Sequence, residues 1–581
     1  MNRNLVYGEI FVDELARAGL KAVCAAPGSR HTPLMLAFAK HPDIHVYSHL
    51  DERSAAFFAL GLALASNEPV ALVCSSGTAG ANMYPAIIEA HQSRVPLLVL
   101  TADRPHELRH SGANQTIDQI KMFGDFVLWF VDAALPEANP PAVAIRNLRT
   151  LAARALAKAN GIRKGVVHIN MPFRKPLEPT PVEGDVIDVP IGAEARESQK
   201  PFSKVIEGQL ILSEAGREIA HIVADYPDGL MIAGINAGYH SPFESRDITT
   251  LARFWNYPLI ADPLSGTRFG EGEAIGGYET FMKQPSIPAP DVIIRFGDLP
   301  LSKWLNTYIS NHPPRYYIHF SQSNEWSDDA HLVTHQVRYE LSVRMLNQME
   351  RSSTLTTQYS ALEKTTWQTI DHEIDTGEYF DGAAVYDVVD CIPDESTLFV
   401  GNSLPVRHLD QFGKPQNKRI YTYANRGASG IDGNISTALG AGAARPDNPL
   451  VGIFGDITFY HDMNGLLAVH RCGIPVTIVL INNDGGGIFN RLPIKNYEPE
   501  FTEYFITPHG LDFSHAAKLY GLDYVQLDIY AAGTRQAFRE AFTASVTGRK
   551  STIIELRSDS KRDEARRQAI VQAVHSAIQE I

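Results

Sequence analysis

Residues 450–489 read LVGIFGDITFYHDMNGLLAVHRCGIPVTIVLINNDGGGIF, and this stretch decides the fold. It contains two apolar runs, at 450–454 and 476–481, with a helix-like segment between them. Both runs end abruptly in polar residues and glycine. Two parallel strands joined by a helix bring their polar ends to one edge of a sheet, where open α/β sheets bind ligands. The stretch therefore predicts a βαβ unit with a binding site at that edge.

The polar ends of the two predicted strands carry residues suited to a metal-bound diphosphate. Asp456 and Asn483 would offer oxygen ligands side by side, which is what Mg²⁺ prefers. The glycines at 485–487 allow close approach of the backbone to a phosphate. A plain βαβ unit with polar loop ends remains the alternative, because Gly-Asp is common after a strand.

Composition narrows the class of protein. The chain has 581 residues, 44% of them hydrophobic and 20% charged, which is typical of a globular protein with three or four domains. The formal net charge of −14 argues against non-specific binding of nucleic acid. We therefore expect small-molecule substrates and no nucleic-acid partner.

Cysteine usage and hydropathy indicate the compartment. Four cysteines, at positions 24, 74, 391 and 472, show no metal-ligand spacing and read as reduced thiols. The first 19 residues resemble an amphipathic helix and not a signal peptide, and no stretch of 18 apolar residues occurs. We expect a soluble, cytoplasmic protein without membrane insertion.

Strand and helix signals alternate along the whole chain. Short apolar runs predict strands at 21–27, 45–50, 69–76, 95–103, 164–172, 229–235, 257–262, 291–298, 315–320, 397–403, 419–426, 450–456, 476–484 and 551–557. Residues 176–190 read as a linker, and the polar stretch 346–375 separates a third block. The predicted fold class is α/β, with three successive doubly wound parallel-sheet domains at 1–180, 200–345 and 375–581.

The Gly455-Asp456 and Asn482-Asn483 pairs resemble the cofactor motif of the thiamine-diphosphate (ThDP) dependent decarboxylase and synthase family. Ile457 departs from that motif, which usually has glycine there. Three α/β domains also match the family order of pyrimidine-binding, central and diphosphate-binding domains. The resemblance implies ThDP and Mg²⁺ as cofactors, with Mn²⁺ able to replace Mg²⁺.

The family requires a catalytic glutamate in the first domain, against the pyrimidine ring of the cofactor. Glu52 fits, because it follows the predicted strand at 45–50 and begins the Ala-rich helix at 53–66. An acidic residue at a helix start can instead stabilise the helix dipole, which Asp51 or Glu52 would do alone.

Further cofactor contacts follow from the resemblance, residue by residue. Asp456, Asn483 and the carbonyl oxygen of Gly485 would hold the metal. Ile431 would lie under the cofactor, although it reads equally as a core isoleucine. Gly77, in the loop Ser76–Gly80, either approaches the pyrimidine end or forms a tight turn. Ile488 and Phe489 would face the thiazolium ring and the substrates.

Five more motifs specify a branch of the family. They are PGSR (27–30), TADRP (101–105), GANQ (112–115), GNSLPVR (401–407) and NRGASGIDG (425–433). Together they resemble the transferases that decarboxylate 2-oxoglutarate and add the resulting carbanion to isochorismate by 1,4-addition, on the route to menaquinone or phylloquinone. The resemblance also implies a homo-oligomer, a homodimer at least and commonly a homotetramer, with each site shared between subunits.

The two substrates carry four carboxylates, and a buried carboxylate must be paired. Arginine suits this task because its planar fork donates two parallel hydrogen bonds. The candidate substrate-binding residues are Ser29, Arg30, Arg104, Gln115, Lys303, Ser403, Arg407, Arg426, Ile488 and Phe489. Each loop arginine, taken alone, is more typical of a surface ion pair. Lys303 is followed by Trp304, where some members of the family have a second cationic residue. Either Lys303 alone binds a substrate carboxylate on this side, or the alignment with the family motif is shifted here.

Two other readings stay open. The chain resembles, more broadly, other ThDP-dependent 2-oxoacid decarboxylases and acetohydroxyacid-synthase-like carboligases, which differ in substrate. A non-catalytic protein with this fold is the other alternative. A non-catalytic protein does not need Glu52, Asp456 and Asn483, so the presence of all three favours an enzyme.

Overall fold

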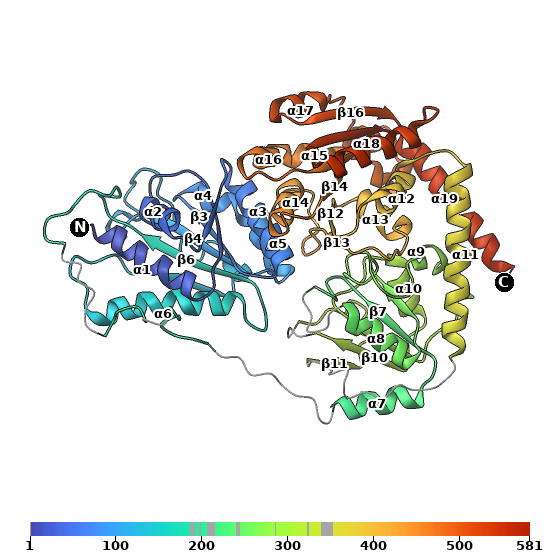
Figure 1. Ribbon diagram of the computed structural model, residues 1–581, viewed down its shortest axis with the longest axis horizontal. Coiled ribbons are helices and arrows are strands. Elements are labelled where there is room, and N and C mark those ends of the chain that lie inside the picture. The colour runs from blue at the N-terminus through green and yellow to red at the C-terminus, as the bar shows by residue number, and fades with distance from the viewer. Residues whose placement is uncertain are drawn as a thin grey trace. The chain divides into compact units, whose positions relative to one another are not determined.

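A computed structural model describes residues 2–185, 192–196, 199–205, 215–239, 245–284, 286–321, 323, 325–338 and 353–580. Three parallel β-sheets follow one another along the chain, with helices between their strands (Figure 1). They have six, five and six strands, which confirms the predicted fold class. Within the described residues, no helix is long and apolar enough to cross a membrane.

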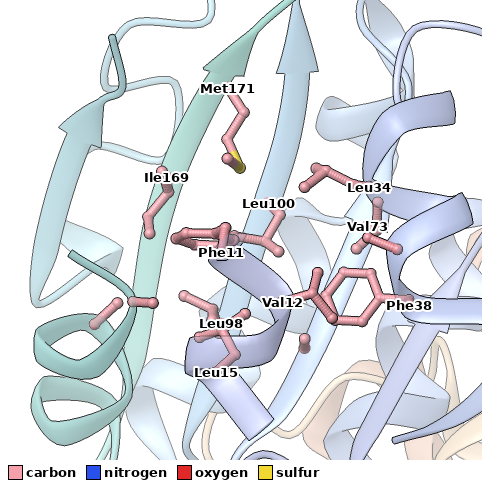
Figure 2. Packing of buried hydrophobic residues seen from close by; sticks show 14 of the residues in the cluster. Phe11, Val12, Leu15, Leu34, Phe38, Val73, Leu98, Leu100, Ile169 and Met171 are labelled. Atoms are coloured by element: carbon pink, nitrogen blue, oxygen red, sulfur yellow. The ribbon is translucent and has the colours of Figure 1, made fainter. Parts of the chain in front are cut away.

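The first sheet has the strand order β2-β1-β3-β4-β6-β5. Its strands are β1 (Ala22–Ala25), β2 (His45–Ser48), β3 (Val70–Cys74), β4 (Leu97–Asp103), β5 (Trp129–Asp132) and β6 (Val166–Pro172). Its helices are α1 (Arg3–Arg17), α2 (Thr32–Lys40), α3 (Glu52–Ser66), α4 (Thr78–Asn82), α5 (Tyr84–Gln92) and α6 (Ala142–Ala159). Figure 2 shows Phe11, Val12 and Leu15 of α1 packed over strand residues such as Leu98, in a fully apolar core.

The second sheet has the order β11-β10-β9-β7-β8. Its strands are β7 (Gly229–Ala233), β8 (Leu259–Ala261), β9 (Val292–Phe296), β10 (Tyr316–Phe320) and β11 (His335–Val337). Its helices are α7 (Ala215–Asp225), α8 (Ser245–Trp255), α9 (Tyr278–Phe281) and α10 (Lys303–Asn311).

The third sheet has the order β13-β12-β14-β15-β17-β16, which repeats the topology of the first. Its strands are β12 (Ser396–Val400), β13 (Ile420–Tyr423), β14 (Leu450–Gly455), β15 (Thr477–Asn482), β16 (Asp523–Asp528) and β17 (Thr552–Arg557). Its helices are α11 (Thr354–Thr376), α12 (Asp381–Cys391), α13 (Leu404–Phe412), α14 (Asn434–Ala444), α15 (Asp456–Asp462), α16 (Leu467–Arg471), α17 (Ser514–Tyr520), α18 (Thr534–Gly548) and α19 (Ser560–Gln579). The quoted stretch 450–489 therefore forms the predicted pair of parallel strands, β14 and β15.

The chain divides into two compact units. The first comprises Met1–Gly208, Asn425–Pro446 and His461–Ile474, and the second comprises Gln209–Ala424, Asp447–Tyr460 and Pro475–Ile581. In the first unit, α3 and α14 pack backbone against backbone. A Cβ at Gly61 would collide with the carbonyl oxygen of Thr437, so glycine is required there. The domain boundaries 1–180, 200–345 and 375–581 stay a prediction, and residue 345 lies outside the described residues.

Two segments differ from the sequence-based expectation. Residues 176–185 form no helix or strand, yet this described part of the predicted linker is fixed to α1. The Asn2 side chain donates to the carbonyl oxygens of Pro176, Glu178 and Thr180; residues 186–190 lie outside the described part. Within 346–375, residues 346–352 also lie outside it. The rest belongs to α11, whose buried face includes Leu355 and Trp367.

Candidate functional site

Several candidate residues follow strands that border the switch points of the first and third sheets. In the third sheet, β12 and β14 are neighbours, and β13 lies on the far side of β12. Ser403 follows β12 and Asp456 follows β14. In the first sheet, Ser29 and Arg30 follow β1, and Gly77 follows β3. Such switch points are where open α/β sheets bind ligands.

The Asp456 carboxylate is fixed by backbone N–H groups. Its Oδ1 accepts from Ile457 N at 2.7 Å, and its Oδ2 accepts from Asn483 N at 3.1 Å and Gly485 N at 2.9 Å. Burial raises the pKa of Asp456, and these N–H groups act in the opposite direction. The N–H at position 457 serves any residue type, which explains why isoleucine is compatible with this arrangement.

Asn483 supplies a second oxygen. Its Oδ1 is buried and has no hydrogen-bond partner among the described residues, an arrangement that is costly for a folded protein unless a ligand completes it. Within the described residues, no group of three or more His, Cys, Asp or Glu side chains can hold a metal. The orphaned amide oxygen beside a carboxylate therefore fits a hard divalent cation such as Mg²⁺.

His509 is a residue that sequence reasoning missed at this place. Its Nε2 lies 3.3 Å from Asp456 Oδ2, and its Nδ1 accepts from Leu511 N at 3.0 Å. Nδ1 also lies 3.4 Å from Asp484 Oδ1, so the imidazole ring stands between two carboxylates. Asp456 Oδ2 accepts from two backbone N–H groups, whereas Oδ1 accepts from one. His509 lies 53 positions after Asp456 in the chain (509 − 456), so no local sequence motif predicts their contact.

The three glycines at 485–487 have a packing role in the structure. Side chains at Gly485 and Gly486 would meet the carbonyl oxygens of Ile506 and Phe505, and Gly486 N donates to Ile506 O at 2.8 Å. A Cβ at Gly487 would lie 2.7 Å from Asn483 Nδ2. The glycines therefore bring residues 505–506 against the loop and leave room for the Asn483 side chain.

Ile488 and Phe489 lie in a short 3-10 helix, Gly487–Arg491, directly after this loop, and both are half-buried. The Phe489 ring packs edge-on against Phe505, with 5.6 Å between ring centroids. Both candidate residues are therefore in the same loop region as Asn483 and Gly485.

In the first unit, the structure separates the roles of Asp51 and Glu52. Asp51 is the N-cap of α3 and accepts from Arg53 N at 2.8 Å. Glu52 is the first residue of α3 and is half-buried. Its side chain forms no hydrogen bond or ion pair with a described residue. Its carboxylate lies near Cys74, where it adds to the effect of burial in raising the pKa of the thiol. Asp51 therefore caps the helix, and the carboxylate of Glu52 is left available to contact a cofactor.

The loop after β3 packs against Gln115. Gly77 has a φ of 79°, and its N–H donates to Gln119 Oε1 at 2.9 Å. The exposed Gln115 donates from Nε2 to the carbonyl oxygen of Ser76 at 2.9 Å. The tight-turn reading of this loop is thus supported, and Gly77 and Gln115 lie together.

Arg30 and Arg104 are buried and lack carboxylate partners. Each is 8% exposed, and neither forms an ion pair with a described residue. Arg30 donates to Phe173 O at 2.9 Å while its Nε has no partner, and Arg104 donates to Ser76 Oγ. Burial and then the nearby Arg104 lower the pKa of Arg30. Among the described residues, only one carboxylate acts on both arginines, that of Asp103, and it is already ion-paired with Arg109 at 3.1 Å. Two neighbouring buried cations with so little opposite charge favour the binding of an anion.

Arg426 and Ile431 lie in the loop between β13 and α14, and both are half-buried. The backbone of this loop is held by Glu89 of α5, whose carboxylate accepts from the N–H groups of Gly427, Ala428 and Ser429. Glu89 is the second residue that sequence reasoning missed, because its partner lies 338 positions away.

The remaining candidates are more exposed. Ser29 and Lys303 are exposed, and Lys303 begins α10. Arg407 is exposed on α13 and donates to the carbonyl oxygen of Ser403 at 2.6 Å. Ser403 has a φ of 75°, an uncommon backbone conformation for serine. Trp304, also exposed, stacks with Lys283, whose Nζ lies 5.3 Å from the ring centroid.

Comparison with known families agrees with this arrangement. Residues 6–122 match the family described as thiamine pyrophosphate enzyme, N-terminal TPP binding domain. Residues 406–556 match the corresponding C-terminal TPP binding domain. The first match contains Glu52 and the arginine pair, and the second contains Asp456, Asn483 and His509.

Relatives and a solved structure extend the likeness over the whole chain. The chain is 56% identical over 99% of both chains to 2-succinyl-5-enolpyruvyl-6-hydroxy-3-cyclohexene-1-carboxylate synthase from Roseiflexus sp. (strain RS-1), and 43% identical over 99% of this chain and 98% of the relative to the same-named protein of Haloarcula marismortui. Its fold is similar to that of the thiamine diphosphate-dependent 4-hydroxybenzoylformate decarboxylase of Rhodococcus jostii RHA1 (TM-score 0.71, 16% identity, 95% of this chain and 99% of that chain). With both TPP binding domains and full-length relatives above 40% identity, the chain belongs to the family of 2-succinyl-5-enolpyruvyl-6-hydroxy-3-cyclohexene-1-carboxylate synthases.

Proposed function

We propose that the protein decarboxylates 2-oxoglutarate and joins the four-carbon remainder to isochorismate by 1,4-addition. The products are 2-succinyl-5-enolpyruvyl-6-hydroxy-3-cyclohexene-1-carboxylate and CO₂, in the biosynthesis of menaquinone or phylloquinone. The observation that supports the proposal is the buried pair Arg30 and Arg104, neither of which forms an ion pair with a described residue, although the Asp103 carboxylate lies near both. An enzyme that acts on pyruvate alone binds a single carboxylate and therefore has less need of two buried arginines.

The cofactors in this proposal are thiamine diphosphate and Mg²⁺, with Mn²⁺ able to replace it. Asp456 Oδ1, Asn483 Oδ1 and the carbonyl oxygen of Gly485 would hold the metal. When bound, thiamine diphosphate would supply a carbon nucleophile for the loss of CO₂ from the 2-oxoacid and the transfer of the remaining four carbons. Glu52 contributes the carboxyl group that exchanges a proton with the pyrimidine ring, and its lack of another partner supports that role. Ile431, Gly77, Ile488 and Phe489 would contact the cofactor.

The substrate carboxylates require cations and hydrogen-bond donors. Arg30 and Arg104 in the first unit would bind one acidic group, and Gln115 would orient the bound 2-oxoacid. Ser29, Lys303, Ser403, Arg407 and Arg426 complete the proposed set. Arginine at these places holds a carboxylate by paired N–H donors and so selects for dicarboxylic substrates.

The proposed active form is a homodimer at least, and a homotetramer as the larger assembly. We place it in the cytoplasm, which agrees with four cysteines that form no disulfide. Sedimentation of the cofactor-loaded protein measures the assembly, and a monomer with full activity would refute a shared site.

Incubation with ThDP and Mg²⁺ tests the proposal directly. We expect isochorismate to disappear only when 2-oxoglutarate is present. Rapid turnover of pyruvate without use of 2-oxoglutarate would instead indicate another decarboxylase or an acetohydroxyacid-synthase-like carboligase. No turnover of any 2-oxoacid by protein that binds ThDP would indicate a non-catalytic relative.

A further inference from the structure

Glu89 occupies a binding nest made by the backbone of the loop that carries Arg426 and Ile431. It lies on α5 and is only 3% exposed. Its Oε1 accepts from Gly427 N at 2.6 Å, and its Oε2 accepts from Ala428 N at 2.7 Å and Ser429 N at 3.3 Å. Three consecutive N–H groups that point at one carboxylate form a concave anion site, which here is filled from within the protein.

The neighbours of Glu89 fix the orientation of its carboxylate, and the loop at residues 427–429 packs tightly against α5. Ser93 Oγ donates to Glu89 Oε1 at 2.8 Å. A Cβ at Gly427 would lie 2.6 Å from Ser93 Oγ and 2.8 Å from the Cβ of Gln92. Only glycine therefore allows the loop to approach α5 closely enough for all three hydrogen bonds.

The far end of the loop is held separately. Asn434 Nδ2 donates to the carbonyl oxygens of Gly430 at 3.1 Å and Asp432 at 2.9 Å. The half-buried Arg426 directly precedes the first N–H that Glu89 binds. Charge-assisted hydrogen bonds are about twice as strong as neutral ones, so the Glu89 contact dominates the near end of the loop.

We propose that Glu89 is a positioning residue for the synthase reaction, which acts by holding the backbone at 427–429 so that Arg426 presents its guanidinium to a substrate carboxylate. The inference rests on the proposed function, because Arg426 has its substrate role there. Glu89 itself touches neither substrate nor cofactor in this scheme. Its loss therefore affects mainly the binding of one acidic substrate, and the intrinsic rate less.

Two variants perturb this contact independently. Glu89→Gln keeps the shape of the side chain but turns an amide NH₂ toward backbone N–H groups. Gly427→Ala keeps Glu89 and pushes the loop away from it. Glu363→Gln is the matched control, because Glu363 also accepts from two backbone N–H groups, of Gly276 at 2.9 Å and Gly277 at 2.8 Å, and from Trp367 Nε1.

Hydrogen exchange and steady-state kinetics of the full-length, cofactor-loaded protein give the test. We expect amide exchange at residues 427–429 to accelerate at least tenfold in both loop variants, and the KM for one of the two substrates to rise at least tenfold with a smaller fall in kcat. The Glu363→Gln control should change neither. Unchanged exchange would overturn the proposal, and so would faster exchange with both KM values within twofold of the wild type.

The two proposals fail in different ways. If the wild-type protein does not consume isochorismate with 2-oxoglutarate, the proposed function is wrong. Exchange at 427–429 then still decides whether Glu89 holds the loop, since that measurement requires no turnover. If the wild type is active and the loop variants keep wild-type KM values, only the inference about Glu89 is wrong.

Discussion

Replacement of Arg30 by glutamine should separate stability from substrate binding. The substitution removes one hydrogen bond, to Phe173 O at 2.9 Å, which is worth about 1–3 kcal/mol for a charged donor. It also removes a buried cation whose pKa is lowered by burial and by Arg104. The lost hydrogen bond destabilises the fold and the removal of the buried charge stabilises it, so we expect the free energy of unfolding to change by no more than about 1 kcal/mol, which is typical of a single substitution.

The effect on substrate binding should be much larger. Loss of one partner of a desolvated, hydrogen-bonded charge pair costs about 2–5 kcal/mol. At about 1.4 kcal/mol per factor of ten, this corresponds to a rise in KM of about 30-fold to several thousand-fold for one of the two substrates. Initial rates with 2-oxoglutarate and isochorismate varied in turn measure both KM values, and thermal unfolding without substrates measures stability.

Arg149 provides the matched control. It is 4% exposed but has a carboxylate partner, with its Nη1 3.2 Å from Glu14 Oε2. Because breaking a buried ion pair costs about 3–5 kcal/mol, Arg149→Gln should lower the unfolding temperature clearly and leave both KM values unchanged. The reasoning is refuted if Arg30→Gln behaves like the control, with lost stability and unchanged substrate binding.

Three further substitutions probe the cofactor site and the folded state. Glu52→Gln should reduce turnover at least a thousandfold while the Kd for ThDP, measured by titration calorimetry, changes less than tenfold; an unchanged rate would exclude Glu52 from the proton exchange. Asp456→Ala should weaken Mn²⁺ binding, followed by electron paramagnetic resonance, and ThDP binding together, whereas loss of only one would contradict a shared metal and diphosphate site. Burial raises the pKa of Asp462 to about 7, above its ordinary value of 3.8, so its charged form destabilises the fold and stability should fall as pH rises between about 4 and 7. Asp462→Asn should therefore reduce the pH dependence of the unfolding temperature between pH 4 and 7, and an unaltered profile would show that Asp462 titrates normally.

The sequence predicted the strands that lie inside the sheets and missed some at their edges. β15 is buried from end to end and β14 is buried except at Gly455, so their apolar runs are continuous and easily recognised. The strands missed, β5, β11 and β16, are edge strands with one neighbour each. In β16, every position is half-buried or exposed and the two alternate irregularly, which gives a weak periodic signal.

The polar stretch 346–375 shows a second limit of prediction from sequence, because most of it forms a helix that was not expected. Residues 354–376 contain many Thr, Gln and Glu side chains, yet they form α11 because an apolar face packs into the core. Ser353 caps the helix by accepting from Thr356 N. A narrow apolar face in a polar helix is readily mistaken for a connecting segment.

At the candidate site, the sequence predicted the residues that follow strands and missed those that support them. Asp456 and Asn483 are recognisable because strand ends bring them together. Glu89 and His509 act through contacts 338 and 53 positions away, and only the folded chain brings these groups together. The sequence did not predict that Gly485 and Gly486 pack closely against residues 505–506, and the approach of these glycines to a phosphate stays a prediction.

Isotope transfer tests the central claim most directly. Protein loaded with ThDP and Mg²⁺ is given isochorismate and 2-oxoglutarate with ¹³C in every carbon, and products are followed by mass spectrometry. The account predicts one labelled CO₂ and one adduct with four labelled carbons for each isochorismate consumed, and neither product with Glu52→Gln. Labelled CO₂ released without consumption of isochorismate, or label transfer that persists in Glu52→Gln, would contradict it.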